Sequence, residues 1–235
     1  MWSERMKCLL IIPAYNEAEN LVNLVKEINE KAPSFDYVII NDGSTDDTAE
    51  ISRENGLNTV NLMNNLGIGG AVQTGYMYAL MNGYDIAVQI DGDGQHDPAY
   101  LDRLIEPILA GRADFTIGTR FIHGKGFQSS GLRRVGINWL NRVIRITAHV
   151  RITDATSGFR AASRGVIRVF AGYYPKDYPE PETIVDVCRH NYRIEEVPVE
   201  MRERNFGTSS IKLTKSIYYM MKVSLAVFIS GLKKH

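Results

Sequence analysis

The chain has few cysteines, no excess of charge and no hydrophobic run as long as a membrane span. Two of its 235 residues are cysteines, Cys8 and Cys188, and their spacing fits neither a disulfide framework nor a zinc site. This favours a reducing compartment. The 27 basic residues balance the 27 acidic residues, so the global positive field that recruits nucleic acid is missing. We therefore expect no nucleic-acid partner.

The hydrophobic runs near the two ends of the chain are short. The first, Cys8–Ile12, ends at Pro13 and is too short for a secretory signal or a span. Near the carboxyl end, Ile217–Leu232 covers 16 residues and contains Lys222, whereas a membrane-spanning helix needs about 20 apolar residues. With lysines also flanking this run, we expect residues 212–235 to form an amphipathic helix that lies on a membrane surface. A small membrane partner or a second copy of the chain is the alternative contact. The expected location is peripheral, on the cytoplasmic face of the membrane.

Short apolar runs alternate with helix-length amphipathic segments over residues 1–211, which we expect to form one catalytic domain. The alternation is typical of the α/β class, with a Rossmann-like, mainly parallel sheet flanked by helices. In such a sheet, ligands bind at the carboxyl ends of the strands. Asn16 and Ser44, each with an acid three residues later, and Asp97 before a proline predict helix starts. The runs that predict strands are Leu9–Ile12, Tyr37–Ile40, Thr59–Met63, Ile86–Ile90 and Phe115–Ile117.

Acidic and amide side chains follow the fourth of these runs directly. Asp91, Asp93 and Gln95 alternate with glycines, and the period of an extended strand would place them on one side. Mg²⁺ and Mn²⁺ prefer such oxygen ligands and can bridge the phosphates of a nucleotide sugar. A calcium loop is an alternative from the spacing, but its sixth position holds His96 instead of glycine. A purely structural acidic turn is the other alternative.

The first two runs also end in polar residues. Asp42 follows the second run, where it can accept hydrogen bonds from a base or a ribose. Pro13, Tyr15 and Glu17 follow the first run, so we expect Glu17 to lie beside Asp42 at the nucleotide end of a site. Taken singly, each of these motifs is equally well explained as a structural turn.

Acidic residues are absent from a long central segment. Between Phe115 and Thr153 there is no aspartate or glutamate, which indicates that an anionic group docks nearby. Arginine suits this role, because its planar guanidinium can bind phosphate through two hydrogen bonds. For any single arginine, the alternative is a solvated face of the helix expected from about Leu132 to His149. The basic residues of the segment are Arg120, Lys125, Arg133, Arg134, Arg142, Arg145 and Arg151.

The order of these motifs resembles that of the family 2 glycosyltransferases of GT-A fold. Ile-Pro-Ala-Tyr-Asn-Glu, Asn-Asp-Gly-Ser and Asp-Gly-Asp-Gly-Gln-His each stand at an expected strand end. The segment Thr156–Arg160 after Asp154, and Arg202, Gly207 and Ser209 in a late loop, are similar to dolichyl- and undecaprenyl-phosphate glycosyltransferases. The resemblance covers roughly residues 7 to 212.

The resemblance implies a metal-dependent, inverting transfer of a sugar from a nucleotide diphosphate donor, expected to be a UDP-sugar, to a polyprenyl phosphate such as undecaprenyl phosphate. Such a reaction feeds cell-envelope glycan synthesis. The implied catalytic residues are Asp93, Asp154 and Arg120, with Asp154 close to the reacting centre. The implied nucleotide-binding residues are Pro13, Tyr15, Glu17, Asp42 and Asp91. The metal, Mg²⁺ or Mn²⁺, is assigned to Asp91, Asp93 and Gln95. The acceptor phosphate is assigned to Arg120, Arg133, Arg134, Arg202 and Ser209.

Two other functions fit parts of the sequence. A sugar hydroxyl of a growing polysaccharide is an alternative acceptor. As a poor nucleophile it needs a carboxylate base, for which Asp154 and Glu182 are candidates. The run Glu180–Glu182 is equally an ordinary helix start, with acids that complement the helix dipole. The third hypothesis is a non-catalytic subunit that binds nucleotide sugars, and the intact acidic motif argues against it.

Overall fold

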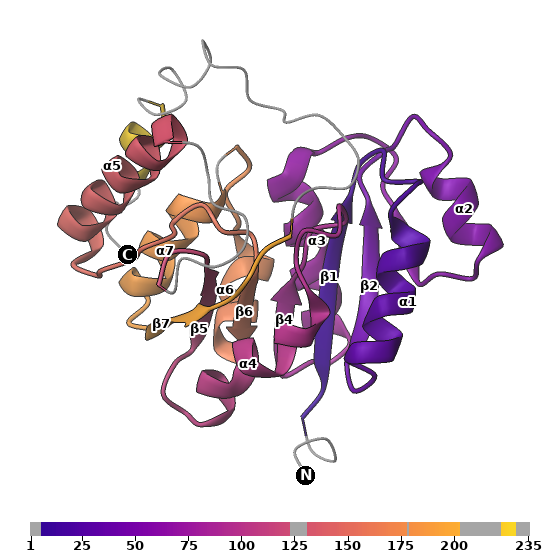
Figure 1. The fold of residues 1–235 in the computed structure, drawn as a ribbon, viewed down its shortest axis with the longest axis horizontal. Coiled ribbons are helices and arrows are strands. Elements are labelled where there is room, and N and C mark those ends of the chain that lie inside the picture. Colours follow the sequence, from indigo (N-terminus) through magenta and orange to yellow (C-terminus); the bar gives the residue numbers. More distant parts are fainter. Residues whose placement is uncertain (1–5, 123–130, 178, 203–221, 229–235) are drawn as a thin grey trace.

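A computed structural model describes residues 6–122, 131–177, 179–202 and 222–228, without the side chains of 131–133. Within these ranges a seven-stranded sheet runs through the molecule in the order β3-β2-β1-β4-β6-β5-β7 (Figure 1). The fold is therefore α/β, as the alternating pattern predicts. The strands are β1 (Cys8–Ala14), β2 (Asp36–Asn41), β3 (Thr59–Asn61), β4 (Ile86–Gln89), β5 (Phe115–Thr119), β6 (Arg160–Ser163) and β7 (Ile194–Pro198).

The five strands expected from the apolar runs are confirmed, and two further strands were missed. β1 to β4 pair in parallel, β6 lies antiparallel between β4 and β5, and β7 is parallel to β5. β6 reads Arg-Ala-Ala-Ser and β7 reads Ile-Glu-Glu-Val-Pro. Neither has the continuous apolar run by which a buried strand is recognised.

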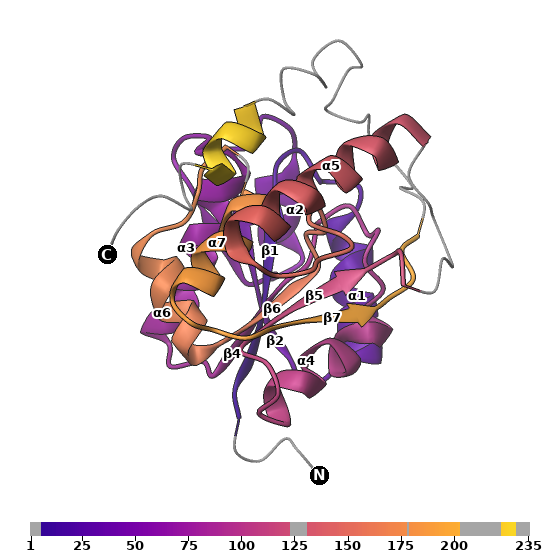
Figure 2. The same ribbon diagram turned by 90° about the vertical axis from the view of Figure 1, so that its left-hand side faces the viewer.

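Helices cover both faces of the sheet (Figures 1 and 2). In β1, Leu10 and Ile12 pack with buried residues of α1 (Leu21–Lys31) and α4 (Leu101–Leu109). Leu9 and Ile11 pack on the opposite face with α3, α6 and α7, and α5 packs on α7. This alternation follows from the period of two along a strand. The helices on the second face are α3 (Gly67–Met81), α5 (Gly131–Ala148), α6 (Arg164–Gly172) and α7 (Pro179–Arg189).

Two of the three expected helix starts were wrong. α1 begins after Asn20, and α2 (Thr48–Glu54) begins after Asp47, without a side-chain cap at either. Asn16 and Ser44 instead join the loops that follow β1 and β2: Ser44 Oγ accepts from the Asn16 N–H at 3.0 Å, and Asn16 Oδ1 accepts from the Thr45 N–H at 2.9 Å. The third start, at Asp97, is confirmed. The Asp97 side chain accepts a hydrogen bond from the Ala99 N–H and caps η1 (Pro98–Tyr100), which leads into α4.

The helix expected from about Leu132 to His149 is confirmed as α5. None of the helices in the ranges given above combines the length and apolar character that a membrane crossing requires. Residues 222–228 are helical, with Val223 and Val227 buried. The expected domain boundary at 211/212 and most of the expected carboxyl-terminal helix lie outside the described residues, so that helix stays a prediction.

Candidate active site

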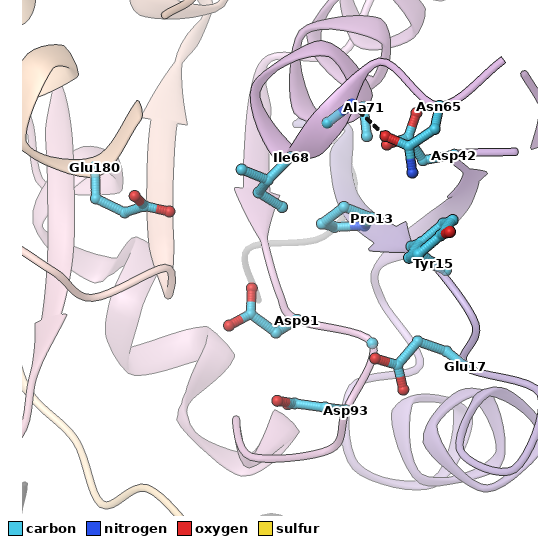
Figure 3. A pocket seen from close by; sticks show the side chains of 13 residues that line it. Pro13, Tyr15, Glu17, Asp42, Asn65, Ile68, Ala71, Asp91, Asp93 and Glu180 are labelled. Carbon is cyan, nitrogen blue, oxygen red and sulfur yellow. Dashed lines mark hydrogen bonds between the residues drawn. The ribbon is translucent and has the colours of Figure 1, made fainter. Parts of the chain in front are cut away.

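A cavity of about 460 Å³ opens at the carboxyl ends of β1, β2 and β4, beside the first turns of α3 and α7 (Figure 3). Its size suits a small-molecule ligand. This is the edge of the sheet at which parallel α/β folds bind ligands. The lining residues are Pro13, Ala14, Tyr15, Glu17, Asp42, Asn65, Gly67, Ile68, Ala71, Asp91, Gly92, Asp93 and Glu180.

One end of the cavity is formed by the loops after β1 and β2, with Pro13, Tyr15 and Asp42 close together in Figure 3. Asp42 is buried, and its Oδ1 accepts from the Leu66 N–H at 2.7 Å. The carboxylate has further lone pairs with which it can bind a ring N–H or a hydroxyl. Tyr15 is 48% exposed, so its ring is accessible to a ligand. Glu17 lines the same cavity, but it lies toward the acidic turn and not beside Asp42 as expected: a Cβ on Gly92 would be 3.4 Å from its Cγ (Figure 3). All five predicted nucleotide-binding residues, Asp91 included, line the cavity.

The acidic motif forms a turn instead of extending β4. β4 ends at Gln89, and Gly94 has a positive φ of 75°, a conformation that glycine adopts without strain. Asp93 is buried, and its Oδ1 accepts from the Gln95 N–H at 3.0 Å. Asp91 and Asp93 line the cavity, whereas the side-chain Nε2 of Gln95 donates to the backbone carbonyl of Arg202 at 3.3 Å. The strand-period argument therefore does not describe how this motif is arranged.

A histidine for which the sequence predicts no function supports Asp91. His96 is buried, and its Nδ1 accepts from the Asp91 N–H at 3.1 Å. The His96 ring stacks on Phe159, with 4.8 Å between ring centroids. These contacts fix the backbone at the start of the acidic turn.

The charge of the cavity bears on whether a metal ion fits there. Five of the lining residues are carboxylates, and none is lysine or arginine. An anionic diphosphate would be repelled from such a site unless a cation offset the charge. Within the described ranges, no three acidic, histidine or cysteine side chains are grouped as a metal site. Two carboxylates, Asp91 and Asp93, still suit Mg²⁺ or Mn²⁺, which often take one or two carboxylates together with substrate phosphates and water.

Two residues that the resemblance assigns to catalysis form a buried ion pair. Arg120 Nε donates to Asp154 Oδ2 at 2.7 Å, and Nη2 donates to Oδ1 at 2.8 Å. Asp154 is fully buried and Arg120 is 7% exposed. Neither residue lines the cavity. Because both oxygens of Asp154 accept from Arg120, the geometry gives this carboxylate the task of orienting the guanidinium.

The acid-free segment brings two of its arginines to one aromatic ring. The guanidinium carbon of Arg120 lies 5.3 Å from the centroid of the Phe121 ring, and that of Arg134 lies 5.2 Å from it. Both distances are within the range of cation–π contacts. The segment thus gathers positive charge at one place. Ser209 and the side chain of Arg133 lie outside the described residues.

Arg202 is committed to acidic side chains. Its Nη1 and Nη2 each donate to a carboxylate oxygen of Glu27 at 2.8 Å, and Nη2 lies 2.6 Å from Asp97 Oδ2. The hydrogen bonds from Arg202 lower the pKa of Glu27. The Arg202 N–H also donates to the Gln95 carbonyl at 2.9 Å. The structure therefore places the start of the late loop beside the acidic turn.

Glu180 lines the cavity, although its motif predicts a helix start and Glu182 was the candidate base. It lies in the first turn of α7, and burial raises the pKa of its carboxyl group. Its neighbour Arg160, also missed, is 1% exposed and donates to the Glu180 carbonyl at 2.7 Å. The available signal for Arg160 was its place at the end of the Thr156–Arg160 motif, but its partners Glu180 and Thr183 lie 20 and 23 residues further along the chain.

Comparison with known proteins agrees with this geometry. The model of the family "Glycosyl transferase family 2" matches residues 9–170. A polyprenol monophosphomannose synthase of Mycolicibacterium smegmatis is 31% identical over 93% of this chain and 86% of its own length. An undecaprenyl-phosphate mannosyltransferase of Micrococcus luteus is 30% identical over 88% of each chain.

Solved structures show the same fold. Glucosyl-3-phosphoglycerate synthase of Mycobacterium tuberculosis, in complex with Mn²⁺, UDP-glucose and phosphoglyceric acid, superposes with a TM-score of 0.77 at 16% identity, covering 100% of this chain and 83% of that one. The family match covers more than half of the chain, and the order of strands and motifs agrees with it. The chain therefore belongs to glycosyl transferase family 2, and it is a glycosyltransferase of GT-A fold.

Proposed function

We propose that this enzyme transfers a sugar, with inversion, from a nucleotide diphosphate donor to a polyprenyl phosphate such as undecaprenyl phosphate. The observation that carries the proposal is an acidic cavity with a nucleotide end at Asp42 and two carboxylates, Asp91 and Asp93, at its centre. Two relatives are named as a polyprenol monophosphomannose synthase and an undecaprenyl-phosphate mannosyltransferase, which supports a lipid phosphate as the acceptor.

The layout of the cavity suits an extended donor. In Figure 3, Asp42 and Tyr15 lie on one side, Asp91 and Asp93 lie lower and between, and Glu180 lies across from them. A nucleoside held at Asp42 brings its diphosphate toward the two central aspartates, and the sugar toward Glu180. Mg²⁺ or Mn²⁺ at Asp91 and Asp93 would supply the positive charge that a leaving diphosphate needs.

We expect a UDP-sugar as the donor, and a GDP-sugar is the alternative. A relative in Methanococcus voltae, 32% identical over 81% of this chain, is named for UDP-N-acetylglucosamine. The mannosyl relatives carry no nucleotide in their names.

The acceptor side explains why no strong base is required. A lipid phosphate oxygen is already anionic near neutral pH, so it can attack the anomeric carbon directly while the bond from that carbon to the diphosphate breaks. Arg120 and Arg134 around Phe121 would hold the acceptor phosphate. A sugar hydroxyl would instead need a carboxylate base, and Asp154 is engaged by Arg120.

Changing Arg134 to glutamine tests the acceptor. We expect the KM for undecaprenyl phosphate to rise about tenfold, the loss of roughly one charged hydrogen bond, with the KM for the donor unchanged. The measurement is initial-rate kinetics of lipid-linked sugar formation in detergent. Arg103→Gln, on an exposed position of α4, is the matched control and should behave as wild type. If Arg134→Gln leaves the acceptor KM unchanged, a sugar-hydroxyl acceptor gains support.

The outer face of α5 suits contact with an anionic membrane. Its exposed apolar side chains are Val135, Trp139 and Ile146, between exposed arginines. Trp139 Nε1 donates to Ser224 Oγ at 3.0 Å, which places the helical segment 222–228 beside α5 (Figure 2). That segment exposes Leu225 and Phe228. Apolar side chains flanked by basic ones are the pattern of interfacial helices.

Serine at both Val135 and Ile146 is expected to weaken binding to vesicles that contain anionic phospholipid by about tenfold, because two exposed apolar side chains can no longer enter the interface. Cosedimentation with such vesicles measures this. Met63→Ser with Met81→Ser removes two even more exposed apolar side chains outside α5 and should leave binding unchanged. Equal losses in both double variants would contradict a docking face on α5.

A further inference from the structure

The end of the cavity opposite Asp42 contains a carboxylate without an assigned task. Glu180 projects into the cavity from the first turn of α7, on the far side of Asp91 (Figure 3). Glu180 is half-buried, and this burial raises the pKa of its carboxyl group. A partly buried carboxylate is stabilised by the hydrogen-bond donors that reach it. A backbone hydrogen bond and the charge of Arg160 already act on the carboxylate. No lysine or arginine lines the cavity, so a ligand bound there can supply further donors.

The backbone of Glu180 is fixed from below by Arg160. Arg160 Nη1 donates to the Glu180 carbonyl at 2.7 Å and to Thr183 Oγ1 at 2.8 Å. Its Nε donates to the Ser157 carbonyl at 2.6 Å, and its Nη2 to the Ala155 carbonyl at 3.1 Å. These four acceptors are neutral oxygens, so Arg160 joins the 155–157 loop to α7 and leaves the Glu180 carboxylate to the cavity. Arg160 is thus a positioning residue.

Space beside Asp91 is kept open by a glycine. A Cβ on Gly158 would lie 3.0 Å from Asp91 Oδ1 and 3.3 Å from Gln89 Nε2. Gln89 is 1% exposed, and among the described residues its Nε2 has no hydrogen-bond partner. Buried amides are nearly always satisfied. The unpartnered donor and the glycine both lie behind the Asp91 carboxylate, so the surroundings of Asp91 are polar and leave room for it.

We propose that Glu180 determines which sugar is used, with its carboxylate accepting hydrogen bonds from two neighbouring hydroxyl groups of the donor sugar. The proposal rests on the proposed function only for the orientation of the donor, nucleoside at Asp42 and sugar at Glu180. Two adjacent ring hydroxyls present two donors to the two oxygens of one carboxylate. The hydroxyl pattern is what distinguishes one hexose from another, so a carboxylate that pairs with two of these hydroxyls discriminates between sugars.

The Glu180→Gln variant distinguishes recognition of the sugar from a general effect of the negative charge on ligand binding. With Mn²⁺ present, titration calorimetry measures the Kd of UDP, GDP, UDP-glucose, UDP-N-acetylglucosamine and GDP-mannose for wild type and for Glu180→Gln. We expect the Kd of the free diphosphates to stay within about twofold or to fall slightly, because one negative charge is removed. The Kd of the preferred nucleotide sugar should rise about tenfold or more.

Three further variants make the result specific. Glu180→Asp keeps the charge but shortens the side chain. It should weaken the binding of nucleotide sugars and leave the binding of free diphosphates unchanged. Asp42→Asn, at the other end of the cavity, should weaken the binding of diphosphates and of nucleotide sugars by the same factor. Glu30→Gln, on an exposed position of α1, should change neither. Thermal unfolding of each variant shows whether it remains folded.

Equal changes of diphosphate and nucleotide-sugar affinity in both Glu180 variants would overturn the proposal. Nucleotide-sugar Kd values that are the same in wild type and in both Glu180 variants would also overturn it. Failure of the proposed function is a different result: wild type would bind a nucleotide sugar in the Glu180-dependent way and yet transfer nothing to undecaprenyl phosphate.

Discussion

Asparagine in place of Asp91 is expected to lower the rate of sugar transfer by about 10³-fold, or roughly 4 kcal/mol of transition-state stabilisation. Asp91 lies at the centre of a cavity that is lined by five carboxylates and by no lysine or arginine. A diphosphate bound there therefore needs a metal ion to offset the negative charge. A neutral amide keeps the size of the side chain but loses the charge that Mg²⁺ or Mn²⁺ requires. Single-turnover transfer kinetics at saturating donor measure the loss.

The fold should survive this change, because the supporting contact of His96 is made to the Asp91 backbone N–H. Asp47→Asn is the matched control, since Asp47 is exposed and makes no side-chain cap to α2. It should retain wild-type turnover. Full activity of Asp91→Asn, with an unchanged response to Mn²⁺, would contradict the role given to the acidic turn.

Removing Asp154 is expected to destabilise the protein by about 3–5 kcal/mol, because Arg120 would keep its charge in a buried site without its partner. Replacing Arg120 by methionine and Asp154 by leucine together should recover most of this loss, since neither charge then remains buried. Urea unfolding followed by circular dichroism measures both. The contrast between single and double variants separates the cost of a stranded charge from the net value of the pair.

The stable double variant also tests the acceptor assignment. It should fold and bind the donor, yet show almost no transfer to a lipid phosphate, because Arg120 is one of two arginines around Phe121. Glu50→Gln breaks the exposed pair with Arg53 on α2 and should change stability little. If Asp154→Ala is as stable as Glu50→Gln, the buried pair does not support the fold as described.

The sequence predicts the parallel half of the sheet well, because each of those strands is a buried apolar run whose end carries a polar motif. β6 escapes the same reasoning, since Arg160 and two alanines occupy it and its burial depends on helices elsewhere in the chain. The pattern could not show an antiparallel strand between β4 and β5. Strand order depends on tertiary packing that a local period does not encode.

The candidate site divides in the same way. Asp42 directly follows β2 and Asp91 comes two residues after β4, so their position at the sheet edge was predictable from the chain. Glu180 enters the cavity from a helix whose sequence reads as an ordinary acidic first turn. Gln95 departs from its predicted direction because Gly94 turns the backbone. Turns of this kind decide side-chain direction through φ, and spacing alone does not reveal it.

The central claim is tested most directly by release of nucleoside diphosphate from UDP- and GDP-sugars, with and without undecaprenyl phosphate, Mn²⁺ or Mg²⁺. The account predicts release that requires both the lipid phosphate and the divalent ion, with one nucleotide preferred. Release at the same rate without the lipid phosphate would contradict it, as would release that is indifferent to chelation of the metal.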